Sequence, residues 1–167
     1  MKKALQIINE MERHGVIRKY AIGGAMAATF YVEPFTTFDL DVFVVLPHAD
    51  DAILLTLTPV YDYLAAQGYL PEKECVIIEG VPVQFLPTYN PLLEEALAQA
   101  REIFYDDVST RVLTLEHLAA IAVQTGRGKD RARLPLFMES EALDHRRLDG
   151  ILARYGLTER WMQWTSP

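Results

Sequence analysis

The chain has 167 residues, 50% of them hydrophobic and 23% charged, which is enough for one globular domain with a sizeable core. Its net charge of −7 excludes a broad basic surface for nucleic acid and leaves only local contacts of that kind. The single cysteine, Cys75, excludes an intramolecular disulfide and predicts a cytoplasmic protein. The first apolar run stops at Asn9-Glu10 and no run approaches ~18 residues, so neither a signal peptide nor a membrane span is expected.

Hydrophobic spacing and the positions of glycine and proline predict an α+β order of elements. The first part is predicted to contain a helix at 4–14, a strand at 16–22, a helix at 25–32, a strand at 38–46, one or two helices at 50–67 and a hairpin at 75–87 that turns at Glu79-Gly80. The second part is predicted to contain a helix at 91–101, an extended segment at 102–113, and helices at 115–125, 129–139, 143–155 and 158–164.

This order predicts a mixed β-sheet flanked by helices within about residues 1–112, followed by a helical C-terminal part at about 113–167. A boundary near residue 112 would leave two small halves, so we predict a single domain, 1–167.

Two carboxylates interrupt the otherwise apolar strand at 38–46. Residues i and i+2 of a strand share a face, so Asp39 and Asp41 are expected to point the same way while Leu40, Val42 and Val44 point into the core. A largely buried carboxylate pair is costly unless a cation lies between its members. Oxygen ligands suit Mg²⁺, or Mn²⁺ in its place. The alternative is a strand edge with both aspartates solvated.

Gly23-Gly24 separates the preceding strand from a helix. Glycines at such a junction let the backbone approach a ligand closely and direct the N–H groups of the helix start toward it. We therefore predict a phosphate site there, with an ordinary turn as the alternative.

Together, Gly23-Gly24 and the Thr37-Phe38-Asp39-Leu40-Asp41 motif resemble the nucleotidyltransferase superfamily with the DNA-polymerase-β-like fold. The form of the motif looks most like the small bacterial branch that includes the AbiEii-type toxins. The segments "VPVQFLP" at 81–87 and "TLEHLAAIAVQTGRGKD" at 114–130 match later family motifs in order. The resemblance implies nucleotide binding by Thr37, metal binding by the two aspartates, and a cationic clamp on the triphosphate by Arg127 and Lys129. A solvated helix start explains these two cations equally well.

Three positions depart from the family pattern, one of them near Ala122 or Val123, where the family often has a lysine. Gln84 stands where the family usually has a third aspartate, and Arg133 stands where it has a later acidic residue. An amide binds water or phosphate but cannot act as a general base. Glu72, Glu74, Asp106 and Asp107 are the candidates to replace the missing carboxylate.

The resemblance implies a metal-dependent enzyme that moves a nucleoside monophosphate from an NTP to a hydroxyl on a protein, an RNA end or a small molecule. Asp39, Asp41 and Lys129 are its expected catalytic residues, and Gly23, Gly24, Thr37, Gln84 and Arg127 its expected nucleotide-binding residues. The alternative is a catalytically impaired nucleotide-binding or partner subunit, for example of a toxin–antitoxin pair. A plain structural domain is a third reading. A cognate partner protein and a second copy of the chain are the expected protein partners.

Overall fold

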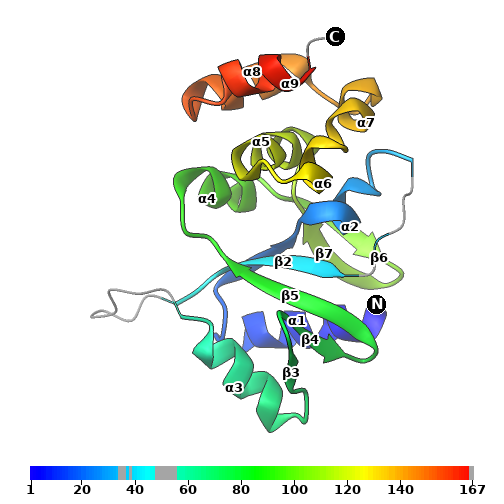
Figure 1. The fold of residues 1–167 in the computed structure, drawn as a ribbon. Helices are drawn as coiled ribbons and strands as arrows, with labels where there is room; N and C mark the ends of the chain where they lie inside the picture. The colour runs from blue at the N-terminus through cyan, green and yellow to red at the C-terminus, as the bar shows by residue number, and fades with distance from the viewer. Residues whose placement is uncertain (34–36, 38, 48–55, 166–167) are drawn as a thin grey trace.

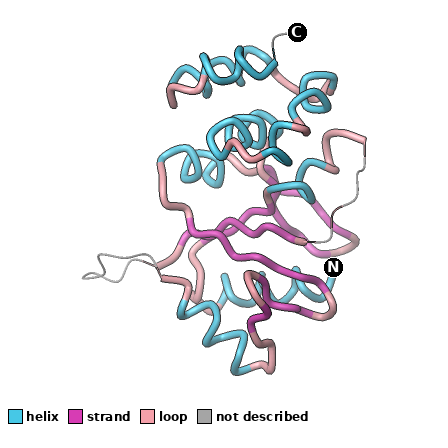
Figure 2. Tube along the Cα trace, in the orientation of Figure 1, coloured by secondary structure: helices cyan, strands magenta, loops and turns pink. Residues whose placement is uncertain are grey.

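The computed structural model describes residues 1–33, 37, 39–47 and 56–165. The helices of these residues are, in chain order, α1 Lys2–Arg13, α2 Gly24–Ala28, α3 Thr58–Ala66, α4 Pro91–Ala98, α5 Leu115–Thr125, α6 Gly128–Arg131, α7 Leu134–Glu139, α8 His145–Arg154 and α9 Thr158–Thr165. The strands are β1 Lys19–Ile22, β2 Leu40–Val45, β3 Pro71–Glu72, β4 Cys75–Ile78, β5 Val81–Pro87, β6 Arg101–Tyr105 and β7 Val108–Val112. Figure 2 shows how these elements alternate along the chain.

The strands form one mixed sheet in the order β3-β4-β5-β2-β1-β7-β6. Strands β2 and β5 are parallel, as are β1 and β7, and the remaining neighbours are antiparallel. Helices α1 and α3 lie on one side of the sheet, and α2 and α4 to α9 lie on the other (Figure 1). The α+β class, the mixed sheet and the helical C-terminal part are confirmed.

Helix α1 forms because its apolar residues recur at helical spacing. Leu5, Ile8 and Met11 are all fully buried. The helix closes through Gly15, whose φ of +73° is left-handed, and the N–H groups of Val16 and Ile17 both donate to the Met11 carbonyl. This closure uses residues that the sequence assigned to a strand, so β1 begins only at Lys19.

Strand β2 alternates as predicted. Leu40, Val42 and Val44 are fully buried, whereas Asp41 on the opposite face is partly exposed. The predicted hairpin is also confirmed, because β4 and β5 pair up to Ile78↔Val81 around Glu79-Gly80. Both turn residues have positive φ, as a two-residue type I′ turn requires.

Several predicted boundaries are wrong. The segment at 102–113 is extended as predicted, but an unpredicted turn at Asp106, whose φ is +54°, divides it into the hairpin of β6 and β7. Strand β3 was not predicted, and α2 ends at Ala28. The helix predicted at 129–139 is divided into α6 and α7, because Pro135 lacks the N–H that a continuous helix needs and lies instead in the first turn of α7. The first part of the helical region predicted at 50–67 lies outside the described residues.

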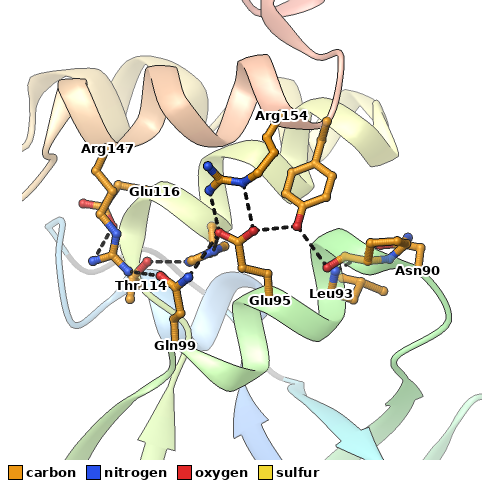
Figure 3. Close-up of polar contacts among 11 residues, drawn as sticks. Asn90, Leu93, Glu95, Gln99, Thr114, Glu116, Arg147 and Arg154 are labelled. Atoms are coloured by element: carbon orange, nitrogen blue, oxygen red, sulfur yellow. Dashed lines mark hydrogen bonds and ion pairs between the residues drawn. The ribbon is translucent and has the colours of Figure 1, made fainter.

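A polar cluster attaches α8 to α4 and α5, and we define it by Glu95, His117, Arg154 and Tyr155 (Figure 3). The Glu95 carboxylate accepts from the Arg154 guanidinium at 2.8 and 3.1 Å and from the Tyr155 hydroxyl at 2.5 Å. The fully buried His117 ring contacts Glu95 through Nε2 at 3.4 Å and the Thr114 hydroxyl through Nδ1 at 2.9 Å. Thr114 occupies the N-cap position of α5, but its hydroxyl binds the His117 ring and makes no hydrogen bond to the backbone N–H groups of the helix start.

The charges of this cluster decide its protonation. The Arg154 guanidinium, with the Tyr155 hydroxyl and His117, holds the pKa of Glu95 at about 2. Burial lowers the pKa of His117, although Glu95 acts in the opposite direction. A carboxylate only accepts, so the neutral ring donates its Nε2–H to Glu95 and accepts from Thr114 at Nδ1.

Within the described part of the chain, no helix is both long and apolar enough to cross a bilayer.

Candidate functional site

The two aspartates lie where β2 begins. Asp39 immediately precedes the strand and Asp41 is its second residue; both are partly exposed. The Thr37 hydroxyl donates to Asp39 Oδ1 at 3.3 Å, which ties the Thr-x-Asp motif together. Burial, and then the charge of Asp39, raise the pKa of Asp41. The carboxylate pair is therefore a place where a cation would be stabilising.

The two glycines allow α2 to pack directly on β2. Gly24 has a φ of +57°, and a Cβ atom there would lie 1.8 Å from Asp41 Oδ2. A Cβ atom on Gly23 would lie 2.3 Å from the Phe43 ring. The Gly23 N–H donates to the Asp41 carbonyl at 2.9 Å, so this amide is used within the fold. Phosphate binding at the glycines stays a prediction, centred on the α2 start after Gly23.

Gln84 lies beside Asp41 on the adjacent parallel strand, because the register of β2 and β5 pairs these two residues. Side chains paired in register point to the same face of a sheet. A carboxylate at position 84 would thus have joined the aspartate pair. The amide that stands there adds an oxygen ligand but no charge.

Three cations act on Asp41 from the loop and short helix after α5. Lys129, Arg127 and Arg133 each lower its pKa, in that order of size, against the larger effect of burial. The buried Asp130 accepts from Arg127 at 2.7 and 3.3 Å and lies 3.6 Å from Arg133 Nη1. Asp130 therefore orients the two arginines.

A cleft of ≈ 200 Å³ lies between the β2–β5 part of the sheet and the helices α5 to α7. One group of its lining residues is polar apart from a glycine: Gly24, Asp41, Gln84, Arg127, Asp130 and Arg133. The other group is mostly apolar: Phe43, Leu86, Pro87, Tyr89, Leu93, Leu118, Ile121, Ala122, Gln124, Thr125 and Phe137. Four of the predicted site residues therefore line one cleft, with Asp39 and Lys129 close enough to act electrostatically on Asp41.

The apolar part of the cleft was missed by sequence reasoning. Leu118, Ile121, Ala122 and Thr125 occupy positions i, i+3, i+4 and i+7 of α5, which is the spacing of one helix face. This signal was available but does not distinguish a cleft wall from ordinary core. Arg133 was noted only as a departure from the family pattern.

Three of the four candidate replacements for the third carboxylate lie at the edges of the sheet. Asp106 and Asp107 belong to the β6–β7 turn at the far edge of the sheet, where Asp107 binds Lys2 at 2.5 Å. Glu72 is exposed on β3 at the other edge. Across the described residues, no group of three or more histidine, cysteine, aspartate or glutamate side chains is arranged to hold a metal ion. The site thus offers a carboxylate pair and an amide.

No protein-family model and no curated protein matches the sequence. Solved structures do match. An antigenic nucleotidyltransferase-like protein from Paracoccidioides brasiliensis has a TM-score of 0.58 at 13% identity, over 96% of this chain and 91% of that one. The antibiotic-resistance factor ANT(2'')-Ia gives 0.55 at 12% identity for its solution structure, over 97% and 96% of the two chains. Its crystal structure with adenylyl-2''-tobramycin gives 0.56 at 12% identity, over 95% and 98%. The mixed sheet of this chain and its flanking helices therefore form a nucleotidyltransferase-like fold.

Proposed function

We propose that the cleft binds an NTP with a divalent cation and transfers its nucleoside monophosphate to a hydroxyl acceptor. The observation that carries this proposal is the placement of Asp41, with Asp39 beside it, in one cleft with Arg127 and Arg133, while Lys129 also acts electrostatically on Asp41. A triphosphate needs both features, because a carboxylate-bound metal and basic side chains offset its charge. The nucleotidyltransferase-like fold of the neighbouring structures supports the same assignment.

Each residue then has a definite part. Asp39 and Asp41 would hold Mg²⁺ or Mn²⁺, which when bound stabilises the charge on the triphosphate and the departing pyrophosphate. Lys129 and Arg127 lie against the triphosphate, and Asp130 fixes the guanidinium of Arg127. Gly24 leaves room for Asp41 and Gly23 for Phe43, while Thr37 orients Asp39. Gln84 donates its amide N–H to a phosphate oxygen or to water.

In the transfer step the acceptor oxygen forms a bond to the α-phosphorus. The bond from that phosphorus to the oxygen bridging to the β-phosphate breaks, and pyrophosphate leaves with the electron pair. The hydroxyl proton passes to water or to a phosphate oxygen, since the Gln84 amide cannot take it. The adenylylated tobramycin in the ANT(2'')-Ia complex makes a small-molecule hydroxyl one acceptor class to test, beside a protein or an RNA end.

The test is transfer of label from α-³²P-labelled NTPs in the presence of Mg²⁺, scored on the protein itself and on added acceptors. Labelling is expected with the native protein and is expected to disappear in Asp39→Asn and Asp41→Asn. Unchanged labelling in both variants would contradict the assignment of the site.

Gln84 favours a second candidate function, a nucleotide-binding subunit without turnover, such as a member of a toxin–antitoxin pair. Its neutral amide stands beside Asp41 where a third carboxylate would complete the charge set. Calorimetry that finds NTP·Mg²⁺ binding without any transfer supports this candidate, and transfer gained in Gln84→Asp would identify the missing group. The AbiEii-type branch, a cognate partner protein and a homodimer stay predictions; light scattering after size exclusion tests the last.

A further inference from the structure

We propose that Gln124 is a specificity-determining residue that reads the edge of the nucleobase. Its amide N–H group is inferred to favour bases with an exocyclic carbonyl, such as guanine and uracil, over bases with an amino group there, such as adenine and cytosine. This inference rests on the nucleotide site proposed above and adds the place of the base and the residue that selects it.

The division of the cleft indicates where the base lies. The phosphates belong with Asp41 and Arg127, which leaves the apolar part for the flat, uncharged ring. Leu86 lies two residues beyond Gln84 on β5, ~7 Å further along the strand, and faces Leu118 and Ile121 of α5 across the cleft. Tyr89 lines the same cleft with 72% of its surface exposed, so its ring is available to stack on any base.

Gln124 lines this part of the cleft, and its neighbours fix which way its amide points. Asn90 is the N-cap of α4, and its Oδ1 accepts from the Leu93 N–H at 3.0 Å (Figure 3). The oxygen of Asn90 is thereby committed to the helix start, so its Nδ2 is the group left to donate. That Nδ2 donates to Gln124 Oε1 at 3.0 Å. The Gln124 oxygen is thus used, and its Nε2 has no hydrogen-bond partner among the described residues.

An amide NH₂ can only donate. A base carbonyl accepts from it, whereas a base amino group meets it donor to donor and both groups lose their partners. Sites that discriminate through a buried hydrogen bond do so mainly because the wrong ligand leaves polar groups unpaired. The N-cap of α4 therefore sets the polarity of the group that faces the base, through Asn90 and Gln124.

Two substitutions reverse this polarity without changing side-chain size. Gln124→Glu keeps an oxygen to accept from Asn90 and replaces the donor in the cleft with an acceptor. Asn90→Asp keeps the cap on Leu93 but removes the donor to Gln124, so the Gln124 amide turns and presents its oxygen to the cleft. Both variants are expected to change selectivity in the same direction, although Asn90→Asp leaves Gln124 in place.

Isothermal titration of ATP, GTP, CTP and UTP with Mg²⁺ tests the inference on the native protein and both variants. The ratios of GTP to ATP affinity and of UTP to CTP affinity are expected to fall at least tenfold in each variant. The negative charge added by Gln124→Glu weakens all four nucleotides alike, so the ratios carry the test. The matched control is Tyr89→Ala, which is expected to weaken all four while leaving the ratios unchanged. Thermal unfolding checks that each variant is folded.

Ratios that stay within about twofold of the native values in both variants would overturn the role of Gln124 while the nucleotide site stands. A native protein that binds none of the four nucleotides would overturn the proposed function together with this inference.

Discussion

Glu95→Gln tests how the C-terminal helices are held on the rest of the fold. Arg154 and the other cluster residues hold the pKa of the Glu95 carboxyl at about 2, against 4.5 for a free glutamate. At about 1.4 kcal/mol per pH unit this difference corresponds to ~3 kcal/mol. The Arg154 side chain is 54% exposed, so water screens the pair and we expect a loss of about 1–2 kcal/mol in the free energy of unfolding at pH 7.

The pH dependence distinguishes this electrostatic origin from a packing defect. A carboxyl whose pKa is lowered on folding contributes fully above pH 4.5, and the contribution disappears as the pH falls toward 2. Urea unfolding of the native protein and Glu95→Gln at several pH values in this range is therefore expected to give a difference that shrinks to near zero. The matched control is Glu94→Gln, at an exposed neighbouring position of α4, with an expected change below about 0.5 kcal/mol. A difference that stays constant down to pH 2 would refute the reasoning.

Three further predictions concern the site. Gly24→Ala is expected to destabilise the fold and to abolish NTP·Mg²⁺ binding, because the new Cβ atom displaces the Asp41 side chain. The control is Gly15→Ala, at a residue with a similar φ but no neighbouring atoms, which is expected to cost only about 1–2 kcal/mol of stability. Equal effects of the two substitutions would contradict this prediction. Asp41→Asn is expected to raise the unfolding temperature of the metal-free protein, because burial and Asp39 raise the pKa of Asp41 and thus disfavour its charged form at pH 7. The same substitution is expected to remove the thermal stabilisation by NTP·Mg²⁺. A lower metal-free unfolding temperature would speak against this reasoning. Asp130→Asn is expected to lower the free energy of unfolding by about 1–3 kcal/mol and to weaken NTP binding, because Asp130 no longer holds Arg127. Urea unfolding and calorimetry measure the two effects, and Asp149→Asn, at an exposed position, is the control. An unchanged nucleotide affinity would show that Arg127 does not need Asp130 to orient it.

The features of the fold that were predicted correctly are determined by residues close together in the sequence. The alternation of β2 is encoded in six consecutive positions, and the β4–β5 turn is encoded by Glu79-Gly80, where glycine accepts the positive φ. The turn between β6 and β7 gave no such signal, because Asp106 adopts its positive φ without a following glycine. Pro135 does indicate the division between α6 and α7, but the apolar and basic residues around it favoured the prediction of one continuous helix.

The site combines residues that are close in the sequence with residues that only the fold brings together. The aspartates and glycines belong to one segment, so their association is visible in the sequence, but the cations come from residues almost ninety positions later. Which of them reach Asp41 depends on how α5 crosses the sheet and on the buried Asp130 that pairs with two of them. The hydrogen bond between Asn90 and Gln124 depends in the same way on the packing of α4 against α5.

Gln84 and Arg133 both make the charge of the cleft less negative, which becomes clear only from their positions in the structure. Each stands where the superfamily that the sequence resembles has an acidic residue, and both line the cleft that contains Asp41. A neutral amide in place of a carboxylate removes one negative charge, and an arginine in place of an acid changes the charge by two in the same direction. We therefore expect the cleft to bind a second divalent cation less readily and to bind a phosphate better through protein groups alone. Gln84→Asp and Arg133→Asp, tested singly and together, would show whether these two changes compensate each other.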